Sequence, residues 1–126
     1  MQSTIVPLSQ AVPVANENIL AYQTEEAGSV PVTIKRDTFS IAPPMVIDID
    51  CKKAVVIGAG EKVTLYLPPG RHVATIGRAS DLALKSTALC GTSTVEFPIG
   101  IERDGPNRFR MSFTGSGYVL GATATE

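Results

Sequence analysis

AVVIGAGEKVTLYLPPGRHVATIG, residues 54–77, contains the clearest pattern of strands and turns in the chain. Three short runs rich in valine, leucine and tyrosine are separated by turn residues. Gly58 and Gly60 interrupt the first pair of runs, and a Pro-Pro-Gly sequence at 68–70 interrupts the second. Glycine supplies the positive φ of tight turns, and Pro-Gly fits the central places of a type II turn. We predict strand, turn, strand, turn, strand, arranged as two consecutive hairpins.

Alternation of apolar and polar residues extends this pattern over most of the chain. In residues 61–67 it directs Val63, Leu65 and Leu67 inward and leaves Thr64 and Tyr66 outward. The other runs that read as strands are 30–36, 45–51, 93–102, 108–113 and 118–122. In residues 45–51 the same rule places Asp48 and Asp50 together on one face, with Ile47 and Ile49 on the other.

Short strands separated by turns every 8–12 residues indicate one all-β domain. We expect an antiparallel β-sandwich of about seven to eight short strands over residues 29–126, with a small barrel as the alternative. Residues 1–28 differ, because they are rich in proline and small polar residues, and we expect an extended tail or tether that is partly docked. Within it, Asn16 would cap a short helix, or residues 19–22 would form an edge strand; periodicity over so few residues leaves both readings open.

Composition excludes some classes of function. Charged residues make up 18% of the chain and the net charge is −1, so the basic footprint of a nucleic-acid-binding protein is missing. Arg108 and Arg110 alternate with Phe109 and so point to the opposite face of their strand. No cofactor motif is present: the glycines at 58 and 60 precede a strand rather than a helix, unlike a phosphate-binding loop.

His72 is the only histidine and therefore the first candidate for catalysis or metal binding. Asp48 and Asp50 would be its possible partners across neighbouring strands. A lone histidine with scattered serines and aspartates has negligible specificity for a triad, and clustered zinc ligands are absent. We expect His72 to be a partly exposed strand residue, and the two aspartates to lie on a solvated polar face. The chain is predicted not to be an enzyme and not to bind a metal.

Cys51 and Cys90 are too far apart in sequence for a CxxC motif. In an oxidising compartment they would form one disulfide, worth roughly 3–4 kcal/mol by the loop-entropy model. In the cytosol they would be small buried apolar residues. The N-terminal sequence has no basic and apolar leader, which favours the cytosol or a mature exported chain that carries a starting Met. No run of about 18 apolar residues predicts a membrane-spanning helix.

The chain resembles small bacterial envelope lipoprotein domains of unknown function. The resemblance is carried by a Lys-Arg-Asp sequence at 35–37, Ile-Asp-Ile-Asp at 47–50, GEKVTLYLPPGRH at 60–72, Leu-Cys-Gly at 89–91 and Arg-Phe-Arg at 108–110. The turn with proline, glycine and histidine is also similar to PEGA-type surface domains. The chain departs from the pattern at residues 42–44, where the family has its first cysteine, and at Cys51, where a glycine is usual. The Cys51–Cys90 bridge is therefore a hypothesis rather than a carry-over.

This resemblance implies an exported domain on the periplasmic side of the bacterial outer membrane, with the cytoplasm as the alternative location. A lipid on a cysteine just before Gln2 would be its sole link to the membrane, and residues 2–28 would be the tether. We expect a non-enzymatic structural or interaction module whose partner is another envelope protein or a cell-wall component. The alternative is a module that binds a glycan or cell-wall fragment through Tyr66 and Tyr118, the only aromatic side chains expected to point outward.

Overall fold

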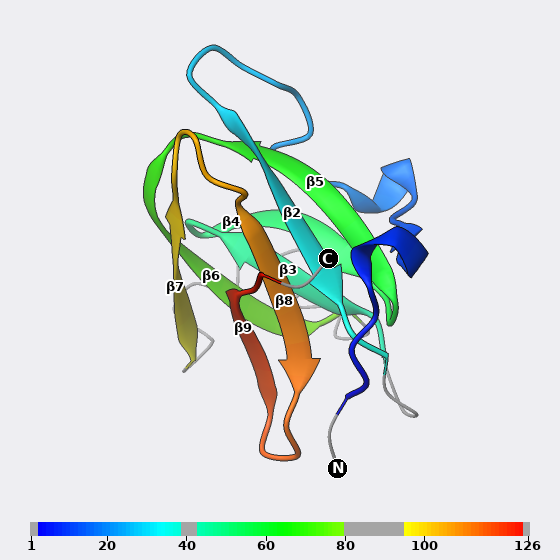
Figure 1. Cartoon of the computed structure of the whole chain (residues 1–126). Helices are drawn as coiled ribbons and strands as arrows, with labels where there is room; N and C mark the ends of the chain where they lie inside the picture. The colour runs from blue at the N-terminus through cyan, green and yellow to red at the C-terminus, as the bar shows by residue number, and fades with distance from the viewer. Residues whose placement is uncertain (1–2, 39–42, 80–94, 125–126) are drawn as a thin grey trace.

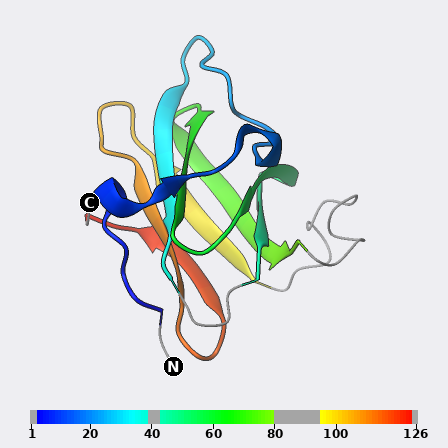
Figure 2. The same cartoon turned by 90° about the vertical axis from the view of Figure 1, so that its right-hand side faces the viewer.

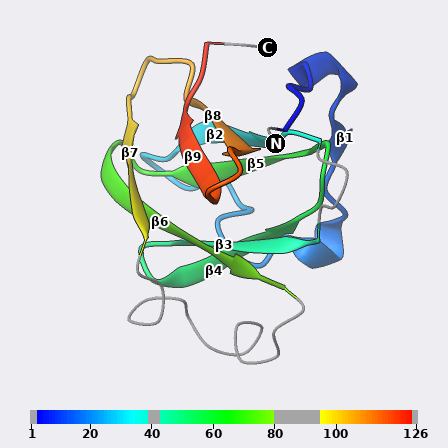
Figure 3. The same ribbon diagram turned by 90° about the horizontal axis from the view of Figure 1, so that it is seen from below.

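The computed structural model describes residues 3–38, 43–79 and 95–124. The strands in these residues form two sheets that pack face to face (Figures 1 and 3). One sheet has five strands in the order β1-β5-β2-β8-β9, and the other has four in the order β4-β3-β6-β7. The predicted β-sandwich is confirmed.

Each strand run predicted from alternation contains a strand of the structure, and one short strand is added from the N-terminal segment. The predicted run 45–51 is too long, because residues 50 and 51 form a turn, and residues 93 and 94 of the run 93–102 lie outside the described residues. The strands are β1 (Val12–Pro13), β2 (Val30–Arg36), β3 (Met45–Ile49), β4 (Lys52–Ile57), β5 (Glu61–Leu67), β6 (Gly70–Arg78), β7 (Glu96–Ile101), β8 (Arg108–Phe113) and β9 (Tyr118–Ala122). Pairing is mostly antiparallel, and the parallel pairs are β1 with β5 and β2 with β8.

The two consecutive hairpins predicted for residues 54–77 are wrong. β4 and β6 belong to the four-stranded sheet, whereas β5 lies in the five-stranded sheet, so both turns carry the chain from one sheet to the other. Alternation gives the inward face of each strand but does not distinguish a strand that pairs with its neighbour from one that packs above it. The consecutive strands that pair antiparallel are β3 with β4, β6 with β7, and β8 with β9.

Apolar side chains on the inner faces of both sheets form one core. On β5, Val63, Leu65 and Leu67 are buried as predicted. β3 differs from the prediction because it is buried on both faces, and the Asp48 side chain is 0% exposed. The solvated face expected for Asp48 is therefore wrong: β3 is a central strand of its sheet, flanked by β4 and β6.

The N-terminal segment, residues 3–22, lies along one side of the sandwich (Figure 2). β1 adds to the edge of β5, and Leu20 N donates a 2.8 Å hydrogen bond to Ala54 O at the edge of β4. Both sheets thus gain backbone bonds from one segment, which covers strand edges that would otherwise be open. Between these contacts lie two short 3-10 helices, η1 (Leu8–Gln10) and η2 (Asn16–Asn18).

The sequence left open a short helix capped by Asn16 or an edge strand at residues 19–22, and the structure has neither at these described positions. Ala15, not Asn16, stands at the N-cap of η2, and no side chain caps it. Ile19 makes a single bridge to Val55 rather than a strand. Docking by isolated backbone bonds needs no periodic pattern, which is why periodicity gave no decision.

The buried side chain of Arg36 lies at one end of the core, where β2 ends. It follows Val32 and Ile34 on the inward face of β2 and is 2% exposed. Its Nη1 donates to Pro43 O at 2.7 Å and Ile57 O at 2.8 Å, and its Nη2 donates to the Tyr118 hydroxyl at 3.1 Å. Burial lowers the pKa of Arg36, and Tyr118 and Glu61 partly offset this effect. The guanidinium therefore links β2 and β9 of one sheet to β4 of the other.

Replacing this guanidinium should destabilise the fold. We expect Arg36→Met to lower the free energy of unfolding by about 3 kcal/mol, because two carbonyls and a hydroxyl lose their buried donor. Arg71→Met is the matched control, since Arg71 is exposed on β6 and its loss should change the value by less than about 0.5 kcal/mol. Urea unfolding of both variants measures the difference, and equal stabilities would contradict this role of Arg36.

Candidate functional site

His72 lies at the opposite end of the core from Arg36. It stands on the inward face of β6, pairs with Ile99 of β7 and is 8% exposed, so the partly exposed position predicted for it is wrong. Its Nδ1 lies 2.6 Å from Asp50 Oδ2, and its Nε2 lies 2.7 Å from Pro68 O. A carboxylate and a carbonyl only accept hydrogen bonds, so both ring nitrogens must donate. This geometry therefore favours the imidazolium form of the ring, in which both nitrogens carry a proton.

The environment of His72 favours this charged form on balance. Burial lowers the pKa of the ring, but the hydrogen bonds to Asp50 and Pro68 and the charge of Asp50 together raise it above its ordinary value. A general base needs a ring nitrogen with a free lone pair near its substrate. Here each nitrogen is bonded to the protein itself, so the arrangement suits a structural link.

Asp50 holds His72 from the turn between β3 and β4. Asp50 and Cys51 have φ of 52° and 65°, the positive values that two-residue hairpin turns of type I′ require. Asp50 Oδ1 also accepts a 2.9 Å hydrogen bond from Val73 N. Of the two possible partners of His72 considered from the sequence, Asp50 is the one that reaches the ring. Asp48 instead pairs with Thr75, so it stands on the outward side of the sheet from His72.

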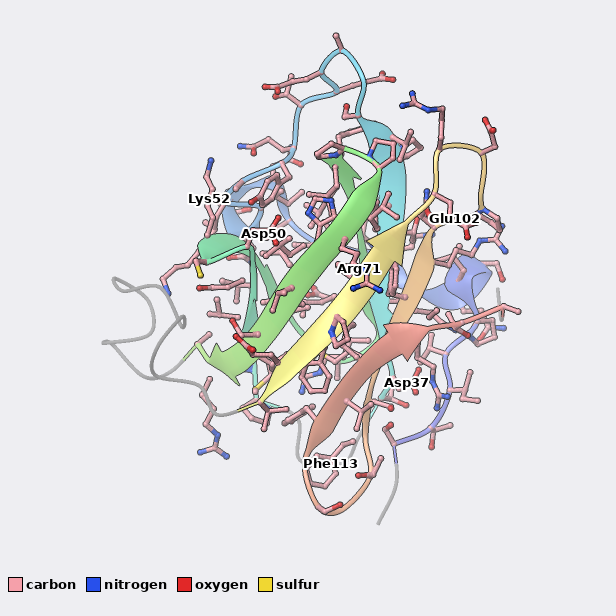
Figure 4. All side chains as sticks on the ribbon, turned by 90° about the vertical axis from the view of Figure 1, so that its left-hand side faces the viewer. Asp37, Asp50, Lys52, Arg71, Glu102 and Phe113 are labelled. Atoms are coloured by element: carbon pink, nitrogen blue, oxygen red, sulfur yellow. The ribbon has the colours of Figure 1, made fainter. Side chains whose placement is uncertain are left out.

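A small cleft lies beside this turn, between the N-terminal segment and β5. Its volume is about 300 Å³, and it is lined by Leu20, Ala21, Tyr22, Gln23, Thr24, Glu26, Lys52 and Tyr66. The mixture of aromatic, amide, hydroxyl and charged groups is suited to a polar ligand with some apolar surface. Figure 4 shows Lys52 beside Asp50 at this end of the molecule.

Tyr22 and Tyr66 form the aromatic part of the cleft. Tyr66 points outward from β5, as predicted, and its backbone N donates to Tyr22 O at 2.8 Å. The Tyr22 hydroxyl donates to Ile49 O at 2.9 Å, and Lys52 Nζ lies 5.5 Å from the centre of the Tyr22 ring. Burial, followed by the charges of Asp50 and Asp48, raises the pKa of Tyr22. Tyr22 has a φ of 61°, a conformation that the sequence does not signal.

Tyr118 does not share the face of Tyr66. It pairs with Phe113 and packs against it with ring centroids 5.1 Å apart, and it stands on the same side of β9 as buried Leu120. The Arg36 guanidinium lies 5.3 Å from the centre of the Tyr118 ring. The outward orientation predicted for Tyr118 is therefore wrong. The two tyrosines lie on opposite faces of the five-stranded sheet.

A larger and more apolar hollow of about 570 Å³ lies on the outer side of β4. It is lined by Asn18, Leu20, Pro44, Val46, Lys53, Val56 and Ala79. Its aliphatic lining provides few groups to orient a ligand, whereas the cleft beside Tyr66 has polar groups on several sides.

The described ranges 3–38, 43–79 and 95–124 bring together no group of three His, Cys, Asp or Glu side chains that would hold a metal ion. They also include no helix of the length and hydropathy that crossing a bilayer requires. Cys51 lies in the turn between β3 and β4, and Cys90 lies outside the described residues, so their disulfide stays a prediction.

Comparison of the chain with family models, curated proteins and solved structures finds no match. The resemblance to envelope lipoprotein domains therefore stays a prediction from the motifs, and the fold and the local chemistry carry the functional argument.

The link through His72 predicts a pH dependence of stability. Because the folded pKa is raised above the unfolded value of 6.5, the contribution is fully present below about pH 6.5 and is lost as the pH rises through the folded pKa. We expect the wild type to exceed His72→Gln in free energy of unfolding most at about pH 6 and least at about pH 9.

Urea unfolding of both proteins across this range measures the difference. The glutamine variant is its own control for pH effects elsewhere in the chain. A difference that stays constant, or grows, as the pH rises would contradict the charged link.

Proposed function

We propose that this protein is a non-enzymatic interaction module of the bacterial cell envelope. The observation that carries the proposal is that the polar side chains with reactive potential serve the fold. His72 and Asp50 bond to each other and to backbone groups, and Arg36 bonds to two carbonyls and a tyrosine. Catalysis needs such groups to converge on a space that a substrate enters.

We infer the envelope location from the motif resemblance. The docking of the N-terminal residues then determines how far the sandwich would lie from the membrane. Ser3 N donates to Phe113 O at 2.9 Å, and Thr4 and Thr38 exchange backbone hydrogen bonds. A lipid attached just before Gln2 would therefore hold the sandwich close to the membrane surface, rather than at the end of a tether of some 28 residues. Contact with a partner would then take place within a short distance of the bilayer.

Location is tested on the product of the full-length gene. Metabolic labelling with a fatty-acid probe, followed by separation of membrane and soluble fractions, should give an acylated protein in the outer-membrane fraction. A cytosolic protein without label would refute the envelope proposal. Substituting the cysteine expected before Gln2 by serine is the control, and it should abolish the label.

A second candidate function is the binding of a glycan or cell-wall fragment. The cleft of Tyr22, Lys52 and Tyr66 favours it, because aromatic rings present apolar surface to a sugar face while amide and hydroxyl groups bond its oxygens. With Tyr118 on the core side, Tyr66 is the member of the predicted pair that remains available at a surface cleft.

Glycan binding is tested by pull-down with peptidoglycan and by a glycan array. If the cleft binds saccharide, Tyr66→Ala should weaken binding by at least about tenfold, which corresponds to about 1.4 kcal/mol. Tyr118→Phe is the matched control and should leave binding unchanged, because Tyr118 lies on the opposite face of the sheet. No binding by the wild type, or equal loss in both variants, would count against this candidate.

A further inference from the structure

We propose that a pocket around Arg110 binds an oxyanion of the phosphate or sulfate type. The pocket has a volume of about 210 Å³ and is lined by Ser3, Arg110, Ser112, Phe113 and Thr114. It lies at the end of β8, toward the Arg36 end of the sandwich and away from the cleft of Tyr66. This inference is independent of the envelope location and of glycan binding.

A buried carboxylate holds the Arg110 guanidinium in place. Arg110 Nε lies 2.6 Å from Asp37 Oδ2, and the Asp37 side chain is 0% exposed while that of Arg110 is 31% exposed. Asp37 is itself held by Val6 N at 3.4 Å and Ser3 Oγ at 3.5 Å. Figure 4 shows Asp37 and Phe113 at this end of the molecule. The ion pair with buried Asp37 therefore fixes the position of the partly exposed Arg110 guanidinium.

The ion pair leaves most of the donors of Arg110 available. A guanidinium carries five N–H groups in a planar fork, and Asp37 accepts from Nε. Within the described part of the chain, neither terminal nitrogen of Arg110 has a hydrogen bond to the protein. Such a fork matches two oxygens of a phosphate or sulfate group.

The local charge balance also favours an anion. Lys35 stands opposite Arg110 on neighbouring β2, is 1% exposed, and donates its Nζ to Val6 O at 2.6 Å. Lys62 of β5 stands opposite Lys35 and donates to Leu8 O at 3.0 Å. Three cations thus lie in a row across three strands, and Asp37 forms an ion pair with one of them, Arg110. An excess of positive charge with carbonyl partners attracts an anion.

Hydroxyl groups complete the pocket. Ser112 follows Arg110 by two residues and so stands on the same face of β8, and Ser3 and Thr114 lie on the other sides. Ser3 Oγ accepts a 3.0 Å hydrogen bond from Phe113 N, which fixes its position. The volume is several times the roughly 30 Å³ of a water molecule, enough for one small oxyanion.

Inorganic phosphate and sulfate are the probes that test this site. Each is titrated at constant ionic strength into the whole protein while the Arg110 Nε–H resonance and backbone amides of Ser112 and Thr114 are followed by NMR. We expect saturable shifts at these positions. Ser112→Glu leaves the Arg110–Asp37 pair intact but places a carboxylate in the pocket, and it should weaken binding at least about tenfold.

Arg110→Lys should weaken binding as well, and Arg71→Lys is the control that should bind like the wild type. Absence of saturable shifts, or equal affinities for wild type and Ser112→Glu, would overturn the proposal. Vesicles of phosphatidylglycerol, compared with phosphatidylcholine, distinguish a lipid phosphate from a free one. Vesicle binding that competes with inorganic phosphate supports a lipid source, and vesicle binding that Ser112→Glu leaves unchanged contradicts the site.

Discussion

The two hydrogen bonds of the His72 ring connect β6 to the turn between β3 and β4 and to the crossing that precedes β6. One bond reaches Asp50 in the turn between β3 and β4, and the other reaches Pro68, where the chain crosses from β5 to β6. Because β5 belongs to the other sheet, this crossing fixes how the sheets meet at one end of the core. At the other end of the core, Arg36 likewise hydrogen-bonds groups from both sheets. The aliphatic core lies between two buried cations.

Because His72 and Arg36 bond to groups of the protein itself, we expect binding to take place on the outer surfaces of the sandwich. A buried cation that hydrogen-bonds groups of the protein itself, as His72 and Arg36 do, holds those groups in place. The cleft beside Tyr66 and the pocket beside Arg110 use the outer face of the five-stranded sheet at its two ends. In both places a hydrogen bond to a buried group holds a side chain of the site: Tyr22 donates to Ile49 O, and Arg110 donates to Asp37. Both surfaces suit binding rather than covalent chemistry.

Local patterning predicted the strands, because alternation with a period of two and turn residues mark strand ends directly. It also directed Val63, Leu65 and Leu67 inward correctly. Pairing was harder to predict, since a turn such as Pro-Pro-Gly serves a hairpin and a crossing between sheets equally well. The burial of Asp48 and His72 depends on central strand positions, and the bond of His72 to Asp50 joins residues 22 positions apart, which a local pattern does not include. Of the two tyrosines in the cleft, the sequence pattern indicated Tyr66 but not Tyr22. Tyr22 adopts a positive φ, and no glycine marks this position in the sequence.

The account is tested most directly by the protonation of the His72 ring. Nitrogen-15 NMR of the imidazole distinguishes the two neutral tautomers from the imidazolium, in which both nitrogens carry a proton. We predict the imidazolium at about pH 6, with a pKa above the ordinary value of 6.5 that falls when Asp50 is changed to Asn. A neutral ring at that pH, or a pKa unchanged by Asp50→Asn, would contradict it.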